Sequence, residues 1–178
     1  AGLNSLAGDI TTTGSNIVLG TAVTLSGDVA MSTGTGAGTI TFSSTVDGTT
    51  AGAEDLTLTA GTGDIAFDGA VGASTRLGAI DIVSAADVDA VAITAASLQQ
   101  QAGTGTTTLA GAIDTDGAAG VSLTGTNLAL NDSLTTTNAG TVTVAQSGTA
   151  TIAAAGDINA DGAVSLTATG GITTAGDI

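Results

Sequence analysis

A short apolar pattern recurs along this chain at a nearly constant step. Val-Ser-Leu begins at Val121, Val-Thr-Val at Val142 and Val-Ser-Leu again at Val164, which gives steps of 21 and 22 residues. Two further series keep a step of 20 to 24 residues: Leu130, Ile152 and Ile172, and Leu134, Ile158 and Ile178. Such a step is typical of proteins built from stacked structural repeats. The repeat therefore constrains the fold more than any single motif does.

Within each repeat, apolar residues alternate with polar ones. The stretches TITF, LTLT, IDIV, VSLT and TVTV all have a period of two, which favours β-strands. Gly-Asp and Asp-Gly pairs, such as Gly156-Asp157 and Asp161-Gly162, separate the stretches and favour turns. Toward the N-terminus, similar segments are less evenly spaced; they begin at the pairs Val23/Leu25, Ile40/Phe42, Leu56/Leu58 and Ile80/Ile82.

These features predict an all-β fold, a parallel β-solenoid of about eight coils of about 21 residues each. Val, Ile, Leu and Ala are expected to form ladders inside, with Thr and Ser outside. The whole chain, 1–178, is expected to be one solenoid segment of a larger protein or fibre, with an irregular loop around 98–107. An antiparallel β-sandwich is the alternative. The only aromatic residues, Phe42 and Phe67, are few for filling wide sheets, and we expect both in the core.

The charge balance excludes two classes of partner. The chain carries 16 acidic residues, a single basic residue (Arg76) and no His, for a net charge of −15. Nucleic acids and anionic membrane surfaces are bound through Lys and Arg, so neither is an expected partner. Asp81, Asp87 and Asp89 interrupt the most apolar region, so membrane insertion is not expected either.

Three segments carry a resemblance to a known family. GDVAMSTGTGAGTITFSSTVDG (27–48), DLTLTAGTGDIAFDGAVG (55–72) and AVSLTATGGITTAGDI (163–178) resemble the repeats of filamentous-haemagglutinin-like and related β-strand-repeat adhesins. These are large exported surface proteins of bacteria. The resemblance rests on composition and rhythm, and it implies a right-handed β-helix, export, and a role as a stalk or adhesive element outside the cell.

Few residues are candidates for chemistry. Without His or Lys the chain offers no ordinary general base, so we do not expect an enzyme. Arg76 is expected in a loop with a solvated side chain. Asp87 with Asp89, and Asp114 with Asp116, each place two carboxylates on one face of a strand, and these four residues are the candidates for a weak Ca²⁺ site. No other cofactor is expected.

The expected function is therefore structural: an extracellular rod, stalk or filament whose coils stack end to end on neighbouring repeats or on other copies. The alternative is a binding module whose threonine-rich face recognises a glycan, a host surface or ice. Thr-x-Thr pairs suggest it, although their uneven spacing predicts that they lie on different faces. The pairs are Thr11/Thr13, Thr39/Thr41, Thr57/Thr59, Thr106/Thr108, Thr135/Thr137, Thr141/Thr143, Thr149/Thr151 and Thr167/Thr169.

Overall fold

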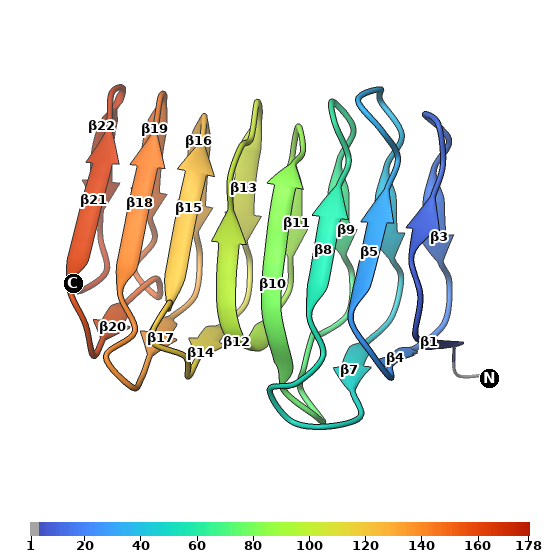
Figure 1. Cartoon of the computed structure of the whole chain (residues 1–178). Helices are drawn as coiled ribbons and strands as arrows, with labels where there is room; N and C mark the ends of the chain where they lie inside the picture. The colour runs from blue at the N-terminus through green and yellow to red at the C-terminus, as the bar shows by residue number, and fades with distance from the viewer. Residues whose placement is uncertain (1–3) are drawn as a thin grey trace.

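The computed structural model describes residues 4–178, and over this range the chain is a β-solenoid of twenty-two short strands without a helix (Figure 1). The chain winds through eight coils, and the strands of each coil pair in parallel with those of the coils before and after it. The predicted parallel β-solenoid of about eight coils is confirmed. No helix of the length and apolar character needed to cross a membrane occurs among the described residues.

Three faces run along the rod; most coils contribute one strand to each face, whereas within residues 4–178 coil 4 has no strand on face 1 and β12 of coil 5 belongs to faces 1 and 2. Face 1 holds β1 (Asn4–Leu6), β4 (Val23–Leu25), β7 (Val46–Gly48), the start of β12 (Ile93–Gln100), β14 (Ile113–Thr115), β17 (Leu134–Thr136) and β20 (Ile158–Ala160). Its ladder narrows in coil 4, where only isolated bridges from Val71 to Val46 and to Ile93 connect β7 with β12.

Face 2 is the face turned to the viewer in Figure 1, and through β12 it forms one eleven-stranded sheet with β14, β17 and β20 of face 1. It holds β2 (Ile10–Thr11), β5 (Val29–Ser32), β8 (Leu56–Thr59), β10 (Leu77–Ser84), the end of β12, β15 (Val121–Gly125), β18 (Val142–Gln146) and β21 (Val164–Ala168).

Face 3 is an unbroken ladder of eight strands. It holds β3 (Ile17–Leu19), β6 (Ile40–Phe42), β9 (Ile65–Phe67), β11 (Val88–Ala90), β13 (Thr106–Leu109), β16 (Asn127–Leu130), β19 (Thr149–Ile152) and β22 (Gly171–Thr174).

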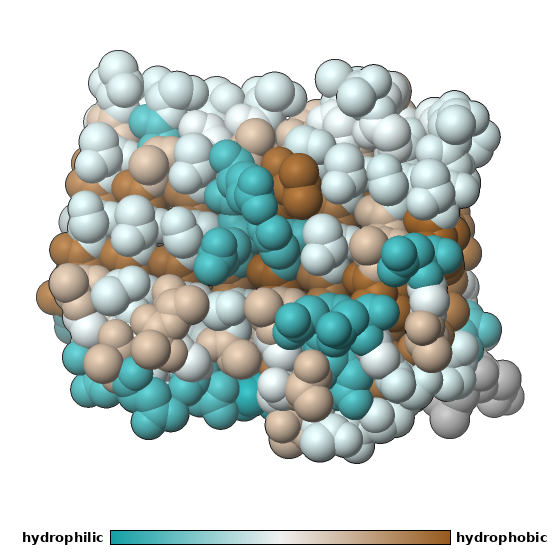
Figure 2. Space-filling view, viewed as in Figure 1, coloured by the Kyte–Doolittle hydropathy of each residue, from teal (hydrophilic) through white to brown (hydrophobic). Residues whose placement is uncertain are grey.

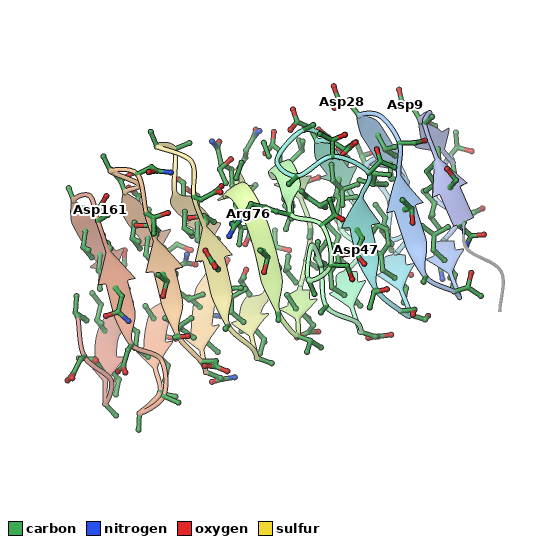
Figure 3. The ribbon with its side chains drawn as sticks, turned by 90° about the horizontal axis from the view of Figure 1, so that it is seen from below. Asp9, Asp28, Asp47, Arg76 and Asp161 are labelled. Carbon is green, nitrogen blue, oxygen red and sulfur yellow. The ribbon has the colours of Figure 1, made fainter. Side chains whose placement is uncertain are left out.

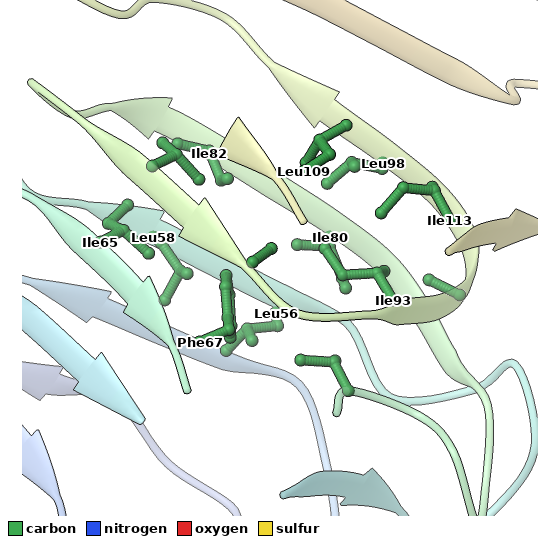
Figure 4. Packing of buried hydrophobic residues seen from close by; sticks show 14 of the residues in the cluster. Leu56, Leu58, Ile65, Phe67, Ile80, Ile82, Ile93, Leu98, Leu109 and Ile113 are labelled. Atoms are coloured by element: carbon green, nitrogen blue, oxygen red, sulfur yellow. The ribbon is translucent and has the colours of Figure 1, made fainter. Parts of the chain in front are cut away.

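The core is a set of apolar columns that run along the rod axis. Alternate strand residues point inward and stack on their counterparts one coil away, and Figure 4 shows this packing around the middle coils. Both phenylalanines are buried, as expected, and their rings stack face to face with centroids 5.1 Å apart. Strands from three faces close on a thin interior, so small and medium apolar side chains suffice to fill it.

The repeat registers found in the sequence are confirmed in part. Val121, Val142 and Val164 pair in register, as do Leu130 with Ile152 and Leu134 with Ile158. Ile172, however, pairs with Ala150, so its predicted alignment with Ile152 is wrong by two residues. A shift of two residues keeps a side chain on the same side of a strand, so alternation alone cannot detect it.

The four N-terminal pairs do not begin equivalent segments. Val23/Leu25 lies on face 1, Ile40/Phe42 on face 3, and the other two, Leu56/Leu58 and Ile80/Ile82, pair with each other on face 2. Their spacing is uneven because they belong to different faces, and the first two pairs lie in the same coil.

The irregular loop expected around 98–107 is shorter than predicted at both ends. Residues up to Gln100 belong to β12 and those from Thr106 to β13, so only 101–105 lie outside strands. Two polar side chains of this stretch point inward: Gln100 is 2% exposed and accepts a hydrogen bond of 2.7 Å from the buried Thr107 hydroxyl, whereas Gln99 and Gln101 are exposed. Two buried polar groups that bond each other can replace an apolar pair in a core.

Glycine permits close stacking at several corners between coils. Gly111 turns the chain from β13 into β14, and a Cβ at this position would meet the backbone carbonyl of Val91 in the coil below. A Cβ at Gly20, on the corresponding corner of coil 1, would meet no atom within 4 Å. The coil spacing therefore demands glycine at some corners and only tolerates it at others.

Candidate functional site

The predicted calcium ligands Asp114 and Asp116 lie beside Arg76. The Arg76 guanidinium forms ion pairs with the carboxylates of Asp114 at 3.2 Å and Asp116 at 3.3 Å. It also donates hydrogen bonds to the backbone carbonyls of Ala95 at 2.7 Å and Asp114 at 3.0 Å. A bound cation in this place would have to compete with the guanidinium for both carboxylates.

Arg76 does not have the solvated side chain that we expected. Its side chain is only 20% exposed, and it extends from coil 4 across coil 5 to coil 6. Figure 3 shows it at the middle of the rod. Local sequence patterns do not reveal this arrangement, because the partners Ala95 and Asp114 are 19 and 38 residues away along the chain. The one sequence feature that distinguishes Arg76 is that it is the only basic residue in the chain.

The other predicted pair, Asp87 and Asp89, lies on face 3 at β11, whereas Asp114 and Asp116 belong to face 1 at β14. The fold thus does not bring the four carboxylates together. Asp87 accepts a hydrogen bond of 2.6 Å from the backbone N–H of Thr106 in the next coil, and Asp89 is exposed on the strand. In the part of the chain that the structure describes, no three acidic side chains gather as a metal site would require.

Many acidic and amide side chains join one coil to the next. The backbone N–H of a residue in a corner or in the first residues of a strand donates to an Asp or Asn about 19 to 28 residues away, at distances of 2.6 to 3.1 Å. Figure 3 labels Asp9, Asp28, Asp47 and Asp161 among these side chains. The acceptors are Asp9, Asn16, Asp28, Asp47, Asp55, Asp64, Asp87, Asn127, Asp157 and Asp161. They satisfy N–H groups where the strand ladders are interrupted.

Glu54 is a buried acid that the sequence analysis did not single out. It is 5% exposed and lies in the 49–55 loop between β7 and β8. The Thr49 hydroxyl donates to one carboxylate oxygen at 2.5 Å, and the backbone N–H of Thr50 donates to both oxygens. The hydrogen bond from Thr49 holds the pKa of Glu54 below its ordinary value of 4.5, although burial acts in the opposite direction. The Glu54 carboxylate therefore stabilises the 49–55 loop by bonding to two residues at the start of that loop.

The threonine pairs lie on different faces, as predicted: Thr57/Thr59 is on face 2 at β8 and Thr135 is on face 1 at β17, while three pairs share face 3. The outward columns of face 3 contain Thr39/Thr41, Thr106/Thr108 and Thr149/Thr151 in coils 2, 5 and 7. In coils 3 and 4, one of these columns holds Asp64 and Asp87, and the other holds Ala66 and Asp89. The result is a mixed hydroxyl and carboxylate surface rather than a continuous threonine array.

A shallow groove of about 430 Å³ lies between the turns that follow β2 and β5. Its lining is hydroxyl groups and glycine, with no charged or aromatic side chain; it consists of Thr11, Thr12, Thr13, Gly14, Ser32, Thr33, Gly34, Thr35 and Gly36. The groove lacks the acid–base groups that catalysis would need.

The strongest candidate for an interaction surface is the last coil, formed by β20, β21 and β22. Val164 is 38% exposed although its register partner Val142 in coil 7 is fully buried. Ile172 is 41% exposed, and its partner Ala150 only 2%. In Figure 2, hydrophobic atoms reach this end of the molecule at the left of the view. The inward columns of the core are therefore open to solvent at coil 8.

The backbone at this end is also available for pairing. Among the described residues, β21 and β22 each pair on one side only, with β18 and β19. At face 1 the next layer already begins: Ile158 donates its N–H to the Asp177 carbonyl at 2.9 Å, as Leu134 does to Asp157 one coil earlier. An added strand would thus meet both an apolar column and unpaired backbone groups.

No known protein family, curated protein or solved structure matches this chain. The site must therefore be interpreted from its own geometry.

Proposed function

We propose that this chain is a structural segment of an exported bacterial surface protein, a rigid extracellular rod or stalk whose coils stack end to end on further coils. One observation carries the proposal: coil 8 presents the inward apolar columns of the solenoid, which are buried in coil 7, together with a free strand edge. The partners in this proposal are neighbouring repeats or other copies of the chain.

The net charge of −15 supports axial rather than lateral association. Like charges distributed along the faces repel rods that approach side by side. At the end of the rod, burial of apolar columns and new backbone hydrogen bonds oppose that repulsion. Adding salt should therefore strengthen end-to-end association, since it screens the charges but leaves apolar burial in place.

Two neighbouring positions on β21 provide the test. Val164 points into the open column and Ser165 points outward, so Val164→Asp and Ser165→Asp add the same charge to opposite sides of one strand. We expect the unmodified chain to self-associate as its concentration rises, Ser165→Asp to associate similarly, and Val164→Asp to remain monomeric. Sedimentation velocity measures this directly. A chain that is monomeric at every concentration would contradict stacking between copies.

A second candidate is a binding module on face 3. Three threonine pairs share face 3 in coils 2, 5 and 7, and this favours the candidate because outward hydroxyls can hydrogen-bond to a surface such as a glycan or ice. Replacing Thr106 and Thr108 with valine would remove the hydroxyls and keep the β-branched shape. Glycan-array binding and thermal hysteresis, measured for both proteins, test this candidate; no signal from the unmodified chain would eliminate it.

A further inference from the structure

Coil 4 is the place where the solenoid is least regular. On face 1, Val71 alone bridges β7 and β12, whereas the coils on either side contribute three-residue ladders. On face 2, the register between β8 and β10 shifts between Ile82 and Ser84. Two loops, 49–55 and 72–76, lie next to each other at this corner. At this level of the rod, backbone pairing is thus reduced to isolated bridges on face 1, and on face 2 it continues with a shift in register.

Side chains take over the connection at this level. Asp47 accepts the backbone N–H groups of Ser74 at 2.7 Å and Thr75 at 3.1 Å, which ties coil 3 to the loop of coil 4. Asp55 accepts the N–H of Ala79 at 2.6 Å. These contacts lie between the first three coils and the start of β10.

Arg76 connects the same level to the coils beyond it. Its carbonyl oxygen accepts a hydrogen bond of 2.9 Å from Gly52 in the coil 3 loop. Its guanidinium bonds the Ala95 carbonyl of coil 5 and both Asp114 and Asp116 of coil 6. One residue therefore contacts coils on both sides of coil 4. A planar guanidinium with five donors can serve several acceptors at once, which an ammonium group cannot do.

We propose that coil 4 is a joint in the rod, held closed by the Arg76 guanidinium, at which the chain opens locally before it unfolds as a whole. In a repeat protein each coil contacts only its neighbours, so the weakest interface between coils decides where separation begins. Opening here leaves coils 1–3 and coils 5–8 folded on either side. The joint is independent of whether the ends of the rod associate.

The sequence provides a direct probe of this opening, because Arg76 is the only Lys or Arg in the chain and hence the only tryptic site. Leu77, on the other side of the cleaved bond, is fully buried at the start of β10, so trypsin can act only after this segment leaves the rod. The cleavage rate in low urea, divided by the rate for the unfolded chain, reports the population of the open state when reclosing is fast. Global unfolding is followed in parallel by circular dichroism.

We expect the free energy of the opening that permits cleavage to be smaller than the free energy of global unfolding. We also expect it to depend less steeply on urea, because a local opening exposes less surface. Asp116→Asn keeps the tryptic site and weakens the guanidinium contacts, so it should raise the native cleavage rate about tenfold or more. Arg76→Lys also remains cleavable and should act in the same direction, once its rate is divided by its own unfolded-state rate. Asp68→Asn is the matched control, since the Asp68 carboxylate makes no hydrogen bond or ion pair within residues 4–178.

Two results would overturn the proposal. Cleavage with the same free energy and urea dependence as global unfolding would show that the rod opens only as a whole. Equal native cleavage rates for Asp116→Asn and Asp68→Asn would show that the guanidinium contacts do not hold the joint closed.

Discussion

Leu123 and Leu166 allow a matched comparison of how much a buried and an end-coil leucine each contribute to the free energy of unfolding. Both occupy one inward column on face 2, separated by Val144, which pairs in register with each of them. Leu123 lies between two coils and is 1% exposed. Leu166 lies in coil 8 and is only partly buried against the core. Replacing either leucine by alanine removes the same atoms from the same column.

In the monomer, the two substitutions should lower the free energy of unfolding by different amounts. For Leu123→Ala we expect a loss of about 2 to 5 kcal/mol in the free energy of unfolding, because the change leaves a cavity that neighbouring coils cannot fill. For Leu166→Ala the outer side of the column is already open to water. Only part of the transfer free energy of a leucine side chain is then lost, about 1 kcal/mol.

Urea unfolding followed by circular dichroism, at micromolar protein concentration, measures both values. If coils stack end to end, Leu166 becomes as buried as Leu123 in the associated form. The cost of Leu166→Ala should then rise toward that of Leu123→Ala as the protein concentration increases, while the cost of Leu123→Ala stays constant. Equal costs in the dilute monomer would refute the assignment of an open column at coil 8.

Three further predictions concern the interior and the loops. Phe67→Ala should destabilise the fold by about 3 to 5 kcal/mol in urea unfolding, since it removes one ring of the buried stack. Gly111→Ala should lower the free energy of unfolding by about 1 to 3 kcal/mol, because its Cβ would clash with the backbone of Val91. Gly20→Ala should leave stability unchanged or slightly higher. Thermal unfolding of the two variants measures the difference. Glu54→Gln should destabilise the chain at neutral pH. Because the hydrogen bond from Thr49 lowers the pKa of Glu54 in the fold, the stability due to its ionised form is present above 4.5 and is lost as pH falls through the lower folded value, so the two proteins should converge in acid unfolding titrations.

For the candidate sites, residue patterns predict which carboxylates share a strand face but not which groups they contact. The pairs Asp87/Asp89 and Asp114/Asp116 follow from spacing, but spacing does not reveal what faces them. Asp87 accepts a backbone N–H from the next coil, and the second pair faces a guanidinium. Both depend on which residues lie one or two coils away, and the coils differ in length.

The sequence by itself determined the all-β class, the step of about 21 residues and the inward side of the alternating apolar strands, because alternation and turn chemistry are local properties of a few residues. Only the tertiary structure decided the register of Ile172, the faces to which the N-terminal pairs belong and the partners of Arg76. A shift of two residues preserves the inward side, so local pattern leaves the register open. Stacking of whole coils resolves it, because each corner must close over the coil below.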